Sequence, residues 1–288
     1  EDYLLCHAAF VMPAAFACYK TDGDLKKLRR NTVYLGRVID ANIEGYRAIR
    51  NAGHDILPKA DADFESEKYR KTCLRFFKLM CATSLGKLCA SDHAMNAIDE
   101  MSALNRDIKR FFDENGKFKT DILNTMQTPA LFALKNNILD GAAKEAMIGR
   151  LRKNFAEHGN CLQTGFLGTS ILMPTLSENG MSDIAWELLF QRKNPSWIYS
   201  IDNGATTIWE RWNSYMIDKG MGPKGMNSFN HYAYGVVCEW IWETAAGIAS
   251  DPANPGFKHI IMKPVPDKRL GYLKAEYHSA SGVIRSAW

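Results

Sequence analysis

The stretch GATTIWERWNSY, residues 204–215, holds a single carboxylate, Glu210, between Trp209 and the pair Arg211 and Trp212. A carboxylate between indole rings is partly desolvated, and it can act as a general base that takes a proton from water. Aromatic rings beside polar groups also suit a sugar, because the C–H faces of a pyranose pack on aromatic planes while its hydroxyls need fixed hydrogen-bond partners. These residue types are compatible with a sugar site in which Glu210 acts as the base.

A histidine forms the second candidate. His231 follows the segment MNSFN, in which Asn227 or Ser228 is placed to cap a helix. The positive end of that helix favours a neutral imidazole, which both donates and accepts hydrogen bonds with sugar hydroxyls. Structural roles remain open for both candidates: a carboxylate paired with Arg211, tryptophans that plug the end of a helical barrel, and an ordinary histidine at a helix end.

Amphipathic helices in hairpins must position these side chains, because most of the chain has apolar residues at helical spacing with short polar breaks. Between two of these helices, about residues 191–228 lack periodicity, which is typical of a functional loop. Three apolar stretches after residue 256 predict strands, the last two joined by a turn at Ser279–Gly282. The predicted helices span about residues 4–20, 25–44, 66–90, 92–114, 126–139, 142–158, 165–178, 180–192 and 229–249.

Composition excludes several classes of protein. The chain has 288 residues, of which 46% are hydrophobic and 24% charged, close to ordinary globular usage. The densest basic cluster, Lys26–Arg30, is too short for a nucleic-acid groove, and no apolar run is long enough to cross a membrane. The 7 cysteines include no metal-type CxxC pair, so we expect buried free thiols and favour a reducing compartment. Cytoplasm and periplasm both remain open.

Long stretches resemble the catalytic domain of the bacterial and fungal α-L-rhamnosidases of glycoside hydrolase family 78. They are residues 163–214 (QTGFLG to WERWNS) and 225–248 (GMNSFNHYAYGVV to AAGI), with MQTPALFAL before them and PGFKHIIMKP and SASGVIRSAW after them. The resemblance implies an (α/α)6 barrel over residues 1–250, incomplete at its N-terminus, and the first strands of a β-sandwich over 256–288. It also implies inverting hydrolysis of terminal α-L-rhamnose from glycosides or polysaccharides.

The resemblance carries residue roles as well. The family's general base lands on Glu210 and its sugar-contacting histidine on His231, and Trp209 and Trp212 shape the pocket. Inversion needs a second carboxyl group, an acid about 6.5 to 9.5 Å from the base. The family's acid lies in an Asp-rich segment that nothing in residues 1–288 resembles, so we expect it in a missing N-terminal part and expect this fragment alone to be inactive.

A second departure lies at GHDIL, residues 53–57, where Ile56 replaces the family's usual tryptophan while Asp55 can still contact a sugar hydroxyl. No organic cofactor is implied, since an acid and a base suffice for glycoside hydrolysis, and no metal or calcium-loop spacing is present. Two other functions stay open. The barrel could bind sugar without catalysis, or it could be a glycosidase of the same fold for another sugar.

Overall fold

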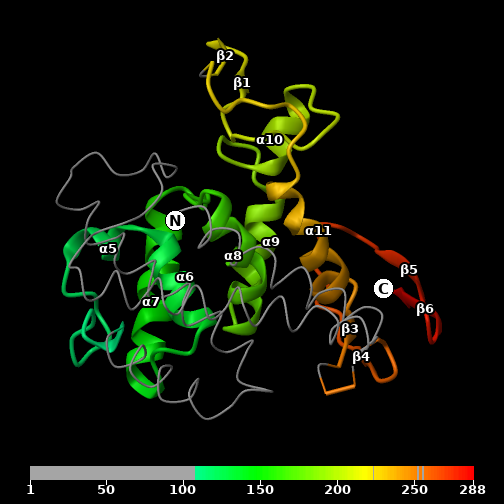
Figure 1. Cartoon of the computed structure of the whole chain (residues 1–288), viewed down its shortest axis with the longest axis horizontal. Helices are drawn as coiled ribbons and strands as arrows, with labels where there is room; N and C mark the ends of the chain where they lie inside the picture. Colours follow the sequence, from blue (N-terminus) through cyan, green and yellow to red (C-terminus); the bar gives the residue numbers. More distant parts are fainter. Residues whose placement is uncertain (1–107, 223, 252, 255) are drawn as a thin grey trace, which may run out of the picture. The chain divides into compact units, whose positions relative to one another are not determined.

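A computed structural model describes residues 108–222, 224–251, 253–254 and 256–288. The described residues, which are drawn in colour in Figure 1, fall into two compact units that are treated separately below. One unit contains Phe112–Ala246 and Pro264–Gly271, and the other contains, of the described residues, 108–111, Gly247–Lys263 and Tyr272–Trp288. The predicted helices over residues 4–90 lie outside the described residues, as does Asp55.

The first unit is mainly helical. Its elements in chain order are α5 (Asp121–Thr125), α6 (Gln127–Lys135), α7 (Gly141–Glu157), α8 (Phe166–Glu178), α9 (Ser182–Phe190), α10 (Trp197–Asp202), strands β1 (Tyr215–Met216) and β2 (Gly220–Met221), a 3₁₀ helix η1 (Ala233–Val236), α11 (Val237–Trp240) and a π-helical turn η2 (Ile241–Ala245). The predicted helices that begin near residues 126, 142, 165 and 180 are confirmed as α6 to α9. The predicted loop contains α10 and the small hairpin β1–β2.

Burial separates the helices into two layers. All residues of α6 from Pro129 to Leu134 are buried, whereas α7 buries one stripe that includes Met147 and Leu151. A helix that is apolar all round belongs inside, and one with a single apolar stripe belongs outside. α6 contacts both α7 and α8, and α8 contacts α9, η1 and α11 (Figure 1). Paired inner and outer helices are the arrangement expected of the predicted barrel.

The predicted helix over residues 229–249 is wrong in its bounds. Helical structure begins only at Ala233, because the backbone before it pairs with the segment around Ile208 instead. It also ends early, since Gly247 has a φ of 70° and the chain then forms strand β3, Ile248–Ser250. The apolar spacing that predicted one helix is shared by a 3₁₀ turn, an α-helical turn and a π-helical turn in series.

The end of the predicted helix over residues 92–114 is also wrong. Phe112 instead forms an antiparallel bridge with Phe118. The carboxylate of Asp113 accepts hydrogen bonds from the backbone of Asn115 (2.9 Å) and Lys117 (2.8 Å), and this local bonding stabilises a turn in place of a helix. α5 follows this turn and was not predicted.

The second unit contains two antiparallel strand pairs. β3 pairs with β4 (Ile260–Met262), and β5 (Lys274–Ser279) pairs with β6 (Gly282–Ala287). The three predicted strands are confirmed, and so is the turn, in which Ser279 lies opposite Gly282. β3 was missed because its apolar residues continue the helical spacing before it. No helix of the described part is long and apolar enough to cross a membrane.

The two described cysteines differ. Cys161 is buried, and burial raises the pKa of its thiol, so it stays protonated. Cys238 is exposed on α11, so the expectation of buried thiols is wrong there. The short helix α11 is amphipathic: Val237 and Trp240 lie on its buried face, and Cys238 lies on its exposed face.

Candidate active site

Two segments that run antiparallel form the backbone of the site. The N–H of Glu210 donates to the carbonyl of Ser228 (2.9 Å), and the N–H of His231 donates to the carbonyl of Ile208 (2.8 Å). Both bonds join the same two stretches of chain. The sequence-predicted base and the sequence-predicted sugar-binding histidine are therefore held together by one small piece of paired backbone, although they are well separated in the sequence.

Glu210 is buried, with 8% of its surface exposed, and one of its oxygens is fixed. Its Oε2 accepts a hydrogen bond of 2.7 Å from the backbone N–H of Ser228. No ion pair reaches Glu210 within the described part of the chain, and the neighbouring Arg211 donates from Nε to the carbonyl of Met226 (2.6 Å). The structural alternative of a carboxylate paired with Arg211 is thus wrong. The second oxygen, Oε1, accepts no hydrogen bond from the described residues.

His231 lies just before η1 and is held from two sides. Its Nδ1 accepts the N–H of Ala233 (3.3 Å), which leaves Nε2 as the protonated nitrogen of a neutral ring and a hydrogen-bond donor. Its ring stacks on that of Phe166, with centroids 4.9 Å apart and planes 9° apart. The imidazole therefore has a fixed orientation with its Nε2–H ready to donate.

The predicted cap of this helix is wrong. The amide of Asn227 donates to the carbonyl of Ser214 (3.2 Å), and the hydroxyl of Ser228 donates to the carbonyl of Asn230 (3.2 Å). Neither side chain caps η1, whose N-cap residue is Tyr232 and has no side-chain cap. Both residues instead build the loop that holds Glu210, because the backbone before η1 is already paired with the Glu210 segment.

An aromatic cluster supports the histidine. Trp212 stacks on Tyr234, with centroids 3.9 Å apart, and its indole Nε1 donates to the carbonyl of Thr164 (3.0 Å). Tyr234 contacts Phe166 at 5.2 Å, and Trp197 meets Trp212 edge-on at 5.3 Å. Sequence reasoning missed Phe166 and Tyr234, although both lie within the two motifs that carry the resemblance. The rings tie α10, the start of α8 and η1 to one another.

Trp209 has a different place from Trp212. It is buried, with 6% exposed, and its ring packs edge-on against Phe229 at 5.2 Å. Trp209 precedes Glu210 and Phe229 follows Ser228, so this contact reinforces the backbone pairing beside the carboxylate. Trp209 thus packs in the interior beside the carboxylate, and its role in shaping a sugar pocket stays a prediction.

Side chains of α6 hold the segment that leads into α8. The buried side chain of Gln127 donates to the carbonyl of Cys161 (3.1 Å) and accepts the N–H of Gln163 (2.7 Å). Gly168, in the first turn of α8, lies so close to α6 that an added Cβ would come within 2.4 Å of Thr128 Oγ1. These contacts fix the end of α8 that presents Phe166 to the histidine.

Comparison with known proteins decides the family. A family model described as bacterial alpha-L-rhamnosidase 6 hairpin glycosidase domain matches residues 8–245, and one described as bacterial alpha-L-rhamnosidase C-terminal domain matches residues 247–288. The chain belongs to the bacterial α-L-rhamnosidase family. The six-hairpin description agrees with the predicted (α/α)6 fold and with the paired helices of the first unit.

Individual rhamnosidases extend the likeness. The chain is 45% identical over 177 residues to an alpha-L-rhamnosidase of Formosa agariphila and 41% identical over 183 residues to one of Alteromonas sp., and in each case it spans 19% of the relative's length. The crystal structure of Streptomyces avermitilis alpha-L-rhamnosidase complexed with L-rhamnose superposes with a TM-score of 0.74 and 29% identity. That match covers 95% of this chain and 26% of the other.

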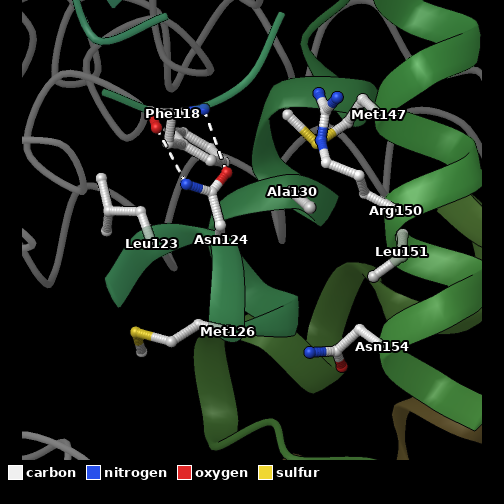
Figure 2. A pocket seen from close by; sticks show the side chains of 9 residues that line it. All are labelled: Phe118, Leu123, Asn124, Met126, Ala130, Met147, Arg150, Leu151 and Asn154. Atoms are coloured by element: carbon white, nitrogen blue, oxygen red, sulfur yellow. Dashed lines mark hydrogen bonds between the residues drawn. The ribbon is translucent and has the colours of Figure 1, made fainter. Parts of the chain in front are cut away.

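A separate hollow lies elsewhere in this rhamnosidase-family chain. Figure 2 shows it between α5, α6 and α7, where the side chain of Asn124 is hydrogen-bonded to the backbone of Phe118. None of the residues that line it belongs to the Glu210 or His231 segments. Within the described residues, no group of three or more His, Cys, Asp or Glu side chains is arranged to hold a metal ion.

Proposed function

We propose that this chain carries the base side of an inverting glycoside hydrolase that releases terminal α-L-rhamnose from glycosides or polysaccharides. The observation that carries the proposal is the buried Glu210, whose Oε2 is fixed by the N–H of Ser228 while no ion pair holds it within the described residues. The family membership and the rhamnose-bound Streptomyces relative support rhamnose as the sugar.

Glu210 acts as the general base in this proposal. The hydrogen bond to Oε2 fixes the carboxylate, so Oε1 can accept a proton from a water molecule as that water attacks the anomeric carbon. The bond to the leaving oxygen breaks on the opposite face of the ring, and the configuration inverts. Inversion also requires an acid that protonates the leaving oxygen, and we assign no residue of this chain to that role.

His231 and the aromatic residues hold the sugar. With Nδ1 occupied by the N–H of Ala233, the Nε2–H of His231 donates to a sugar hydroxyl. Trp212 is half-buried and keeps part of its ring for the sugar, whereas Trp209 shapes the pocket from behind. Asp55 remains a proposed hydroxyl contact. The division into a barrel over residues 1–250 and a β-sandwich over 256–288 also remains a proposal.

The stereochemistry of the first product tests the reaction. The intact protein is mixed with 4-nitrophenyl α-L-rhamnopyranoside, and proton NMR follows the anomeric signals from the first minutes. We expect β-L-rhamnose to appear before the α anomer grows in by mutarotation, because one inverting displacement yields the β sugar. If α-L-rhamnose appears first, the mechanism is refuted. If calorimetry detects rhamnose binding but no rhamnoside is hydrolysed, the protein is a sugar-binding module and not an enzyme. If it cleaves only aryl glycosides of other sugars, it is a glycosidase with a different sugar as its substrate.

A further inference from the structure

Tyr232 stands out beside the candidate site because its ring is exposed. It exposes 80% of its surface, the largest fraction among the large hydrophobic side chains of the described residues. No hydrogen bond holds its hydroxyl within that part of the chain. The neighbouring aromatic residues Trp209 and Tyr234 are buried, so Tyr232 is the ring of this cluster that solvent reaches most freely.

The exposed ring is nevertheless held in a defined orientation. Its plane lies within 2° of the plane of His231, with the centroids 5.6 Å apart, and His231 in turn stacks on Phe166. The backbone below it is also fixed, since the carbonyl of Tyr232 accepts the N–H of Gly235 (2.8 Å). A ring that is already oriented loses little conformational entropy when a second flat surface stacks on it.

The segment Ser228–Tyr232, which carries the exposed ring, is mainly polar and has no permanently charged side chain. It contains no carboxylate, lysine or arginine, and Nδ1 of His231 accepts the backbone N–H of Ala233. A partner for this surface therefore needs an apolar face and no charge. A pyranose ring and an aromatic ring both meet that description.

We propose that Tyr232 is the platform on which the leaving group of the substrate stacks, next to the rhamnose held by His231. The leaving group is a neutral ring with a flat apolar face, either a second sugar or an aryl group. This inference rests on the proposed function. It gives Tyr232 a role in specificity for the part of the substrate that departs, with no role in holding rhamnose itself.

Kinetics on three rhamnosides test the platform in the intact protein. The substrates are methyl α-L-rhamnopyranoside, 4-nitrophenyl α-L-rhamnopyranoside and an α-L-rhamnosyl-glucose disaccharide, and inhibition by L-rhamnose reports on the sugar subsite. For Tyr232→Ala we expect kcat/KM to fall about tenfold on a substrate with a ring as leaving group. We expect the methyl glycoside and the inhibition constant of L-rhamnose to change by less than about twofold, and Tyr232→Phe to behave as wild type because it keeps the ring.

The arms of the experiment separate the outcomes. A loss on the aryl substrate alone supports an aromatic leaving group, a loss on the disaccharide alone supports a sugar, and a loss on both supports any flat ring. Tyr272→Ala is the control, since Tyr272 is 71% exposed and belongs to the other unit. Unchanged kinetics for Tyr232→Ala, or an equal loss on the methyl glycoside, overturns the platform alone. A wild-type protein that cleaves none of the three overturns the proposed function as well.

Discussion

Replacement of Glu210 by glutamine removes the proposed base with little change in shape. The carboxamide oxygen of Glu210→Gln can still accept the N–H of Ser228, so the loop keeps its hydrogen bond. A neutral acceptor replaces a charged one at this 2.7 Å contact, which lowers the free energy of unfolding by about 1 kcal/mol. The amide nitrogen cannot take a proton from water. Loss of a general base lowers kcat about 100- to 10,000-fold, or about 2.7 to 5.4 kcal/mol in the barrier.

Two measurements separate these effects. Steady-state hydrolysis of 4-nitrophenyl α-L-rhamnopyranoside by the intact protein gives kcat and KM, and thermal unfolding should shift by only about 2 to 4 °C. Glu145→Gln, at an exposed position of α7, is the matched control and should match wild type in both. Azide should restore turnover to Glu210→Ala and yield the β-azide, because an anionic nucleophile needs no base. A kcat within about tenfold of wild type for Glu210→Gln refutes the assignment.

Two further predictions concern stability. Gly168→Ala should lower the free energy of unfolding by about 1 to 3 kcal/mol, because its Cβ would lie 2.4 Å from Thr128 Oγ1 and 2.9 Å from Thr164 Cβ. In the double variant Gly168→Ala, Thr128→Ala, the melting temperature should recover part of the loss seen in Gly168→Ala. If it does not recover, the clash with Thr128 is not the cause of the loss. Asp251 has a pKa lowered to about 2, first by its hydrogen bond with His259, so its contribution is complete above about pH 4 and is lost as the pH falls toward 2. In Asp251→Asn, the free energy of unfolding should fall less steeply between about pH 4 and pH 2 than in wild type. If the two curves of unfolding free energy against pH are parallel, the pair of Asp251 and His259 does not contribute to stability.

The positions of helices could be predicted from the sequence where a helix of several turns buries either one face or nearly its whole surface. α7 and α8 begin and end within a residue or two of their predicted bounds, since apolar spacing reports directly on a long helix. Prediction failed where tertiary hydrogen bonds competed with local ones. The residues before Ala233 have helical spacing, yet their backbone groups bond to the segment of Ile208 and Glu210. Spacing carries no information about such a partner.

The candidate site was predictable in its residue types but not in its supports. Glu210 and His231 were identified from their neighbours and from the resemblance, and the structure brings them onto one paired stretch of backbone. Phe166, which stacks on the histidine, was missed because nothing in the sequence links the first residue of α8 to a loop far along the chain. A long-range ring contact depends on how helices pack, which spacing does not encode.

The sequence by itself determined that this protein is built of paired helices with strands after them, and it determined the family, because its motifs are specific and its apolar periodicity is local. Only the tertiary structure decided what each candidate side chain contacts. In the structure, Arg211 donates a hydrogen bond to the carbonyl of Met226, and the N–H of Ser228 donates one to the carboxylate of Glu210. Arg211 can pair with the adjacent Glu210 only if the backbone directs both side chains to the same place. The antiparallel pairing of two segments that are distant in the sequence directs each of them to a different partner.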